Sequence, residues 1–146
     1  PLGAGYNIIQ SKIAVGSGGL KGQGFMQGSQ SQLSFVPEKH TDFIFSILAE
    51  EWGFIGCTVL FIAIVTLLMT SLLLSQLATF RFHKYIMIGV SSFFFLHFTI
   101  NIGMVIGLLP VVGVPLPFLS FGGTHLLVCM SAIGFMLHTE RNINKR

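Results

Sequence analysis

Carboxylate side chains, the residues of this chain best suited to acid–base chemistry, are concentrated in one short stretch. Residues 37–51 contain four of the five acidic residues in the whole sequence, namely Glu38, Asp42, Glu50 and Glu51. A long apolar run follows directly, and a charged group at the centre of a bilayer is penalised by about 3 kcal/mol even on permissive insertion scales. We therefore expect these acids to lie at a water interface, in a protected polar site, or in both.

Helical spacing separates Asp42 from the two later acids, Glu50 and Glu51. On a continuous helix Asp42 and Glu50 would lie about 12 Å apart along the axis and about 80° apart around it. Two carboxylates at that separation cannot share a proton directly. The spacing therefore gives no catalytic carboxylate pair, and we expect Glu50 and Glu51 to be interfacial or supporting acids.

Asp42 itself has two interpretations that its spacing leaves open. Thr41 is a suitable helix N-cap, and an acid in the first turn behind it would stabilise the positive end of the helix dipole by about 0.3–1 kcal/mol. Alternatively, Asp42 forms a mixed charged site with its neighbours Glu38, Lys39 and His40.

The composition indicates that the elements which position these residues are membrane helices. Hydrophobic residues make up 52% of the chain and charged residues only 9%. Residues 52–80 contain no Lys, Arg, Asp or Glu, and neither do residues 85–139. About 20 such residues cross a bilayer, so the first run holds one span and the second has room for two. The predicted fold class is an all-α polytopic membrane protein with three transmembrane helices.

Other classes of protein and site are disfavoured. The net charge is +3, but the basic residues are scattered and form no cluster interleaved with aromatic residues, so we expect no nucleic-acid binding. Cys57 and Cys129 lie inside apolar runs without metal-ligand spacing. The segment GSGGLKGQGFMQG lacks the terminal residues of a phosphate-binding loop, which leaves a flexible connector as its expected role. No initiator Met is present and no signal-peptide pattern occurs, so we expect a part of a longer protein.

The first half of the chain divides into a loop region and a long helix. Residues 1–40 are rich in glycine and polar residues, and we expect an extracytoplasmic loop there. We expect it to contain a short amphipathic helix near Tyr6, Ile9 and Ile13 that rests on the membrane surface. Residues 41–80 should form a transmembrane helix with an acidic outer end. Such a helix would be roughly 60 Å long, twice the hydrocarbon thickness. It must therefore protrude or break, and Gly53 and Gly56 are the candidate positions for the break.

The second half alternates apolar spans with short basic segments. We expect a cytoplasmic loop at residues 81–84, transmembrane helices at 85–109 and 124–139, and a cytoplasmic tail at 140–146. The basic residues of the loop and the tail set this orientation by the positive-inside rule. The acidic stretch then lies outside and the C-terminus lies in the cytoplasm.

Residues 110–123 interrupt this pattern. Three prolines in eight residues exclude a regular helix, yet the stretch is apolar, so we expect a Pro/Gly-rich re-entrant segment on the outer side. Non-helical backbone at membrane depth is tolerated only where protein or a water-filled cavity buries it, which indicates a site. His97 and Asn101 share one face of the preceding helix, and we expect them to make structural hydrogen bonds.

Three motifs, in order and spacing, resemble the C-terminal third of a RodA-type protein of the SEDS family (shape, elongation, division and sporulation). They are GAGYNIIQSKIAVGSGGLKGQG, PEKHTDFIFSILAEEWG and NIGMVIGLLPVVGVPLPFLSFGGT. Together they cover most of residues 3–124. The last motif resembles the elongation branch, RodA, more than the division branch, FtsW. The family fold has about ten spans, so this chain would supply about three of them and is not expected to be active alone.

The resemblance implies a peptidoglycan glycosyltransferase that polymerises lipid II during cell elongation at the outer face of the bacterial cytoplasmic membrane. It implies that Asp42, the aspartate of HTDF, is the catalytic residue, acting as general base on the acceptor sugar's 4-hydroxyl. The candidate supporting residues around it are Glu38, Lys39, His40, Glu50 and Glu51.

The leaving pyrophosphate needs positive charge. The local candidates are Lys21 and Lys39, and a divalent cation, Mg²⁺ or Mn²⁺, is the candidate cofactor. The implied partners are a class B penicillin-binding protein, which is a transpeptidase, other elongation-complex proteins and membrane lipid. Two alternatives stay open, a flippase or transporter of lipid-linked precursors and a membrane scaffold for the transpeptidase. The broken segment at residues 110–123 motivates the transporter, because interrupted helices often line transport pathways.

Overall fold

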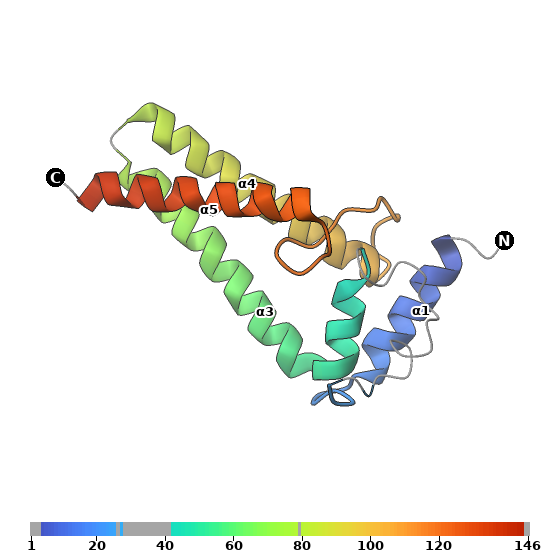
Figure 1. Cartoon of the computed structure of the whole chain (residues 1–146). Helices are drawn as coiled ribbons and strands as arrows, with labels where there is room; N and C mark the ends of the chain where they lie inside the picture. The colour runs from blue at the N-terminus through green and yellow to red at the C-terminus, as the bar shows by residue number, and fades with distance from the viewer. Residues whose placement is uncertain (1–3, 26, 28–41, 79, 145–146) are drawn as a thin grey trace.

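The computed structural model describes residues 4–25, 27, 42–78 and 80–144, and within them every regular element is a helix. The helices are α1 (Ala4–Ser17), α3 (Ile44–Leu77), α4 (Arg81–Val105) and α5 (Gly123–Asn144). In Figure 1, α3 is sharply bent, α1 lies beside its first part, α4 runs back along its second part, and α5 crosses the far end of α3. The contacts agree, since α4 packs most extensively on α3.

The bend in α3 is at Gly53, one of the two positions at which a break was expected. Gly53 has φ 63° and ψ −159°, a backbone conformation that is essentially confined to glycine. It divides α3 into a short arm, residues 44–52, and a long arm, residues 54–77. The long arm alone is about 36 Å long, enough to cross the roughly 30 Å hydrocarbon core.

A glycine loop, comprising residues 18–24, satisfies the backbone groups that the bend leaves without helical partners. The amides of Gln23 and Gly24 donate to the carbonyls of Glu50 and Glu51 at 2.9 and 3.1 Å. In return, the amides of Phe54 and Ile55 donate to the carbonyls of Gly19 and Leu20 at 2.9 and 3.2 Å. The expectation of a flexible connector was therefore wrong, because its bare backbone fits against the bend and binds there.

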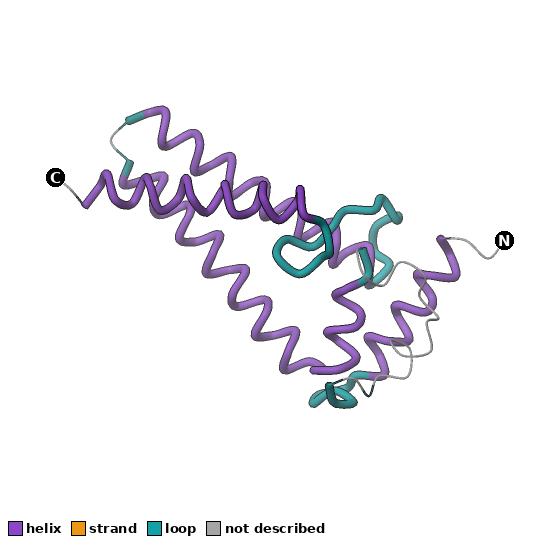
Figure 2. The backbone as a smooth tube through the Cα atoms, viewed as in Figure 1, coloured by secondary structure: helices purple, strands orange, loops and turns teal. Residues whose placement is uncertain are grey.

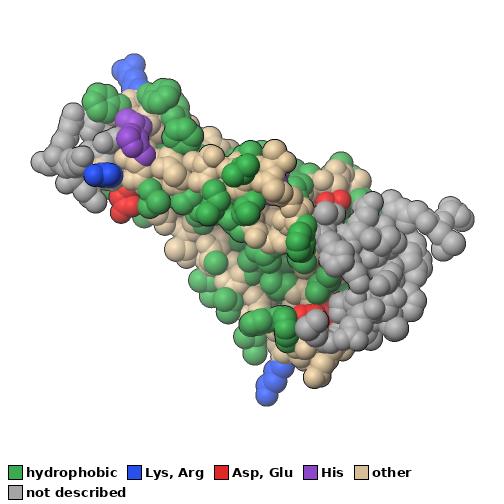
Figure 3. Space-filling model, viewed as in Figure 1, with side chains coloured by type: hydrophobic (Ala, Val, Ile, Leu, Met, Phe, Trp, Pro, Cys, Tyr) green, Lys and Arg blue, Asp and Glu red, His purple; other side chains and the backbone are tan. Residues whose placement is uncertain are grey.

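Two helices, α3 and α4, are long and apolar enough to cross a membrane. Both expose large hydrophobic side chains, among them Phe61, Ile62, Phe95 and Leu96, and such surfaces are rare on soluble monomers. In Figure 3, hydrophobic side chains cover much of the visible face and Lys and Arg lie toward its ends. The third span expected at residues 124–139 stays a prediction, because α5 is less apolar than α3 and α4.

The connection between α3 and α4 is shorter than expected. Residues 81–84, predicted to be a loop, form the first turn of α4 instead. They contain neither glycine nor proline, so nothing in them prevents a helix from starting. The rings of His83 and His138 lie 6.0 Å apart, which shows that the start of α4 and the last turns of α5 lie at the same end of the molecule.

Helix α1 packs through Ser11 and Ala14 and not through Ile9 and Ile13. Ser11 and Ala14 are buried, and the Ser11 hydroxyl donates to the carbonyl of Val105 at 2.9 Å. Ile9 and Ile13, which the sequence pattern placed on an apolar face, are exposed. Small side chains allow the close helix approach that isoleucine would prevent. The exposed isoleucines suit the expected location on a membrane surface, which stays a prediction.

The end of α4 is a Schellman motif. Gly107 has φ 73°, its amide donates to Met104 O at 3.0 Å, and the Leu108 amide donates to Gly103 O at 2.8 Å. This 5→2 and 6→1 pairing closes many helices and favours glycine at the position of Gly107. Gly107 therefore serves to end the helix.

From there the chain runs without regular structure through residues 106–122, the irregular segment, as the three prolines predicted. Figure 2 shows it between α4 and α5, returning toward the start of α3. Leu116 and Pro117 are fully buried within it. The Leu116 amide donates to the Ser120 hydroxyl at 2.7 Å, and the Ser120 amide donates back to Leu116 O at 3.0 Å. The segment is therefore a packed and hydrogen-bonded structure.

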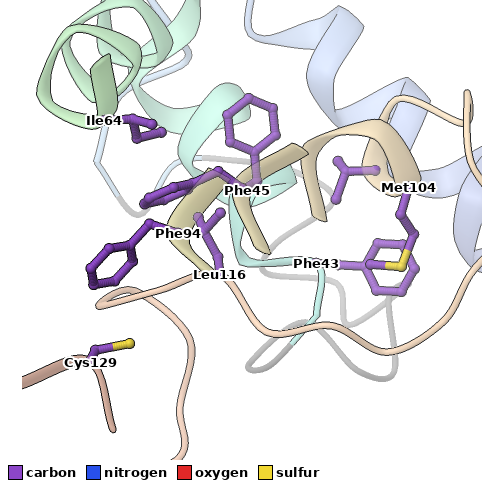
Figure 4. Packing of buried hydrophobic residues seen from close by; sticks show 9 residues of the cluster. Phe43, Phe45, Ile64, Phe94, Met104, Leu116 and Cys129 are labelled. Atoms are coloured by element: carbon purple, nitrogen blue, oxygen red, sulfur yellow. The ribbon is translucent and has the colours of Figure 1, made fainter. Parts of the chain in front are cut away.

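The largest cluster of buried side chains joins the start of α3, the middle of α4, the irregular segment and α5 (Figure 4). Its buried members are Phe43, Phe45, Ile64, Phe94, Phe98, Met104, Val105, Leu116 and Cys129. Phe43 has no exposed surface, so the residue that follows Asp42 is anchored in the core. Cys57 packs at the edge of this cluster and Cys129 within it, in agreement with the packing roles expected for both.

Candidate active site

Asp42 lies just before the first turn of α3. The helix begins at Ile44, its N-cap is Phe43, and that cap has no side-chain hydrogen bond. The expected start, with Asp42 inside the first turn, was therefore wrong by about two residues, and Thr41 lies outside the described residues. The buried Phe43 fixes the start instead, because its carbonyl accepts from both the amide and the hydroxyl of Ser46, at 3.0 and 2.7 Å.

The carboxylate of Asp42 faces the irregular segment at Gly113. A Cβ atom added to Gly113 would lie 3.3 Å from Oδ2 of Asp42, so any side chain there would press on the carboxylate. Gly113 has φ 65°, which also favours glycine. Asp42 is partly exposed. A partly exposed aspartate whose carboxylate lies beside bare backbone can accept a proton from a bound hydroxyl group.

Asn101 of α4 joins the two sides of this site. Its side-chain amide donates to the backbone carbonyl of Asp42 at 2.9 Å and to that of Val114 at 2.7 Å. Asn101 has no exposed surface. One turn earlier, Nδ1 of His97 lies 3.4 Å from the carbonyl oxygen of Pro115. The structural hydrogen bonding expected of this pair is confirmed for Asn101, and His97 faces the same segment.

The other predicted acids are not brought to Asp42. Glu50 and Glu51 lie at the far end of the short arm, beside the bend, about 12 Å along the helix. Glu50 has no exposed surface, so it is not an interfacial acid in contact with water, and Glu51 is partly buried. Glu38, Lys39 and His40 lie outside the described residues.

Lys21 is likewise distant from Asp42. It is exposed on the glycine loop, and its backbone packs beside Gly53. The short arm, about 15 Å long, separates that loop from Asp42. A role for Lys21 at the pyrophosphate stays a prediction that this arrangement does not favour.

Sequence reasoning missed two features of the site. Lys12 of α1 lies over Gly107, where its Nζ would be 2.5 Å from an added Cβ, and so places a cation beside the irregular segment. Its charge also complements the carbonyl end of α4. The other feature is the link from Asn101 to Asp42, 59 residues apart. A polar residue on an interior helix face was the only available signal, and it could not name the partner.

The described residues contain no group of three or more His, Cys, Asp or Glu side chains that could hold a metal ion. Asp42 is the one predicted catalytic acid at this site among the described residues. The divalent cation therefore remains a prediction, without a donor set in this part of the chain.

Three relatives are similar over nearly the whole chain. Peptidoglycan glycosyltransferase MrdB of Escherichia coli (strain K12) is 50% identical over 145 residues, which are 98% of this chain and 39% of that protein. Peptidoglycan glycosyltransferase RodA of Treponema pallidum (strain Nichols) is 44% identical over 94% of this chain and 32% of its own length. Stage V sporulation protein E of Bacillus subtilis (strain 168) is 43% identical over 97% of this chain and 38% of its own length.

One solved structure has the same fold over most of the chain. It belongs to a study titled "Structural coordination of polymerization and crosslinking by a peptidoglycan synthase complex" and matches with a TM-score of 0.75 at 25% identity. The match covers 94% of this chain and 38% of that one. The chain therefore spans about a third to two fifths of the length of the proteins it matches. Residues 1–145 match the family FTSW_RODA_SPOVE, described as "Cell cycle protein", and the chain belongs to that family.

Proposed function

We propose that the full-length protein is a peptidoglycan glycosyltransferase that polymerises lipid II during cell elongation, with Asp42 as general base. The observation that carries the proposal is the partly exposed Asp42 carboxylate facing Gly113. Two relatives at 50% and 44% identity are themselves named peptidoglycan glycosyltransferases. Their names supply the reaction class, and the geometry of Asp42 supplies the candidate residue.

In the proposed reaction, the 4-hydroxyl oxygen of the acceptor sugar attacks the anomeric carbon of the donor. The new bond joins that oxygen to the anomeric carbon, while the bond from the anomeric carbon to the pyrophosphate oxygen breaks. The hydroxyl proton passes to Asp42, and the bonding electrons leave with the lipid-linked pyrophosphate. A positioned base of this kind typically contributes about 10²–10⁴-fold to the rate.

The departing pyrophosphate requires compensating positive charge. Lys39 and Lys21 are the proposed sources from sequence, and Lys12 joins them because it lies beside the irregular segment. A divalent cation, Mg²⁺ or Mn²⁺, would neutralise the same oxygens.

We place the protein in the bacterial cytoplasmic membrane as a multi-pass protein, with Asp42 at the outer face and the C-terminus in the cytoplasm. The start of α4 carries Arg81 and Lys84, and the last turn of α5 carries Arg141. These basic groups share one end of the molecule, as the contact between His83 and His138 requires. Their shared location supports a cytoplasmic end by the positive-inside rule.

The proposed partners are a class B penicillin-binding protein and other elongation-complex proteins. The support is the structural match, whose title describes polymerisation and crosslinking by a peptidoglycan synthase complex. Crosslinking of new strands would follow polymerisation directly. The apolar faces of α3 and α4 leave room for contacts with membrane lipid and with other helices.

The decisive experiment is the Asp42→Asn variant of the full-length protein, assayed for glycan chains formed from lipid II in detergent or liposomes. We expect the rate to fall at least about 100-fold, because the amide cannot accept the proton. Glu140→Gln is the matched control, since it removes an exposed carboxylate from the last turns of α5. Polymerisation by Asp42→Asn at the control's rate would refute the proposed role of Asp42.

A flippase or transporter of lipid-linked precursors is the second candidate, supported by the irregular apolar segment between α4 and α5. Flipping of lipid II in liposomes, measured on the same variant, separates the two. Lost flipping with intact polymerisation would favour the transporter. If both activities survived but the transpeptidase no longer co-purified, a scaffold would be favoured.

A further inference from the structure

We infer that Asn101 is a positioning residue for Asp42, holding the carboxylate against Gly113 for proton transfer. The inference rests on the proposed function and assigns part of that site to α4. Asn101 is buried, and its side chain touches both walls of the site, the backbone of Asp42 and that of Val114, next to Gly113.

The chemistry of the two hydrogen bonds admits only one orientation of the side chain. Both partners are backbone carbonyls, so both accept, and only the NH₂ group of Asn101 can donate to the two of them. Its two hydrogens are thereby used, one for each wall. An aspartate of the same shape would set a carboxylate against two carbonyl oxygens, and a leucine would leave both carbonyls without a donor.

The remaining atom of the side chain points to function. Oδ1 of Asn101 is buried and has no hydrogen-bond partner among the described residues. A buried acceptor without a partner reduces stability by about 1–3 kcal/mol. The two donors, and not this acceptor, are therefore what the Asn101 side chain contributes to the site.

The two hydrogen bonds of Asn101 set the distance between Asp42 and the irregular segment at Gly113 and Val114. Among the described residues, Phe43 anchors the backbone on one side of Asp42, while Gly113 lies in a segment without regular structure. Asn101 ties the two together from a third element, α4. Because a misplacement of about 1 Å can reduce a rate by about 100-fold, loss of this link should affect the chemical step more than substrate binding.

The test compares Asn101→Asp with Ser71→Ala in the full-length protein. Ser71 makes a buried hydrogen bond of the same kind between α3 and α4, to Met87 O at 2.8 Å, but it lies toward the other end of both helices. We expect Asn101→Asp to lower kcat for lipid II polymerisation by about 10–100-fold with KM changed less than about threefold. Ser71→Ala should keep kcat per folded protein while losing thermal stability.

A double variant distinguishes a role of Asn101 that acts through Asp42 from a purely structural role. If Asn101 acts through the Asp42 carboxylate, then adding Asn101→Asp to Asp42→Asn should lower the residual rate by less than about twofold. If Asn101 only stabilises the fold, its effect should be the same in both backgrounds. If the Asn101→Asp protein does not accumulate, Asn101→Ser, which retains one hydrogen-bond donor, replaces it in the same comparison.

The outcomes separate this inference from the proposed function. An unchanged kcat per folded Asn101 variant, with Asp42→Asn inactive, would overturn the inference and leave the general base in place. Full additivity in the double variant would also overturn it. Wild-type activity of Asp42→Asn would instead refute the proposed function, and the inference would fall with it.

Discussion

Replacing Gly53 with alanine should disrupt the junction between the bend of α3 and the glycine loop. An alanine Cβ there would lie 2.8 Å from the carbonyl carbon of Lys21 and 2.9 Å from the carbonyl oxygen of Gly18. It would also contact the amide nitrogen of Gly22. All of these are backbone atoms, which cannot move aside as the end of a flexible side chain can.

Two effects contribute to the expected loss. The conformation of Gly53, with φ 63° and ψ −159°, costs a residue with a side chain about 1–3 kcal/mol. Overpacking against fixed atoms costs a further 1–3 kcal/mol or so. The sum of roughly 2–6 kcal/mol is a large part of the 5–15 kcal/mol by which proteins are typically stable, so the glycine loop should detach from the bend.

The assay is thermal unfolding of the full-length protein in detergent, followed by an intrinsic fluorescence or aggregation readout. We expect Gly53→Ala to lower Tm by at least about 5 °C. Gly89→Ala is the matched control, because Gly89 is exposed within α4 and an added Cβ there meets nothing within 4 Å. A Tm for Gly53→Ala equal to that of the control would refute the requirement for glycine at the bend.

Two further predictions concern the end of α4 and the membrane orientation. Gly107→Ala should destabilise the protein by about 1–2 kcal/mol, because φ 73° disfavours any residue with a Cβ. Thermal unfolding checks this, with Gly134→Ala as the control, because a Cβ added at Gly134 meets nothing within 4 Å. With the native cysteines replaced, Phe82→Cys should react with a membrane-impermeant reagent only from the cytoplasm and Leu20→Cys only from outside. Labelling of both positions from the same side would contradict the proposed topology.

Much of the helical framework could be predicted from the sequence, because apolar runs and breakers act locally. The long apolar run and its excess length predicted both α3 and a break at Gly53 or Gly56. Prolines predicted the irregular segment. These signals depend on neighbouring residues and on membrane thickness, so they do not require knowledge of tertiary packing.

The roles of the glycines could not be predicted in the same way. In the sequence, GSGGLKGQG has the composition of a flexible linker, yet Gly18 and Gly22 approach the backbone of the short arm and the bend too closely for any side chain. The partner is about 30 residues away, and composition carries no information about it. For a similar reason the isoleucine pattern of α1 predicted an amphipathic helix, but it could not show that Ser11 and Ala14 are the residues buried against the other helices.

The candidate site was predicted in part. The HTDF motif singled out Asp42 by resemblance, and the spacing of His97 and Asn101 indicated an interior polar face. That Asn101 binds the backbone of Asp42 depends on the path of the irregular segment, and no local pattern determines that path. Helical spacing of 1.5 Å per residue had already separated Glu50 and Glu51 from Asp42, and in the structure both lie at the far end of the short arm.

The short arm of α3 explains why these distant features belong together. At one end, Asn101 holds the backbone of Asp42 through a hydrogen bond, and at the other the glycine loop holds the bend at Gly53 through four. Between them the arm is a continuous helix, which is stiff over so short a length. A change at Gly53 therefore also alters the support of Asp42 about 15 Å away. Because the break turns the short arm away from the long arm, the acid that begins α3 can lie beside the end of α4, where Asn101 and Gly113 meet it.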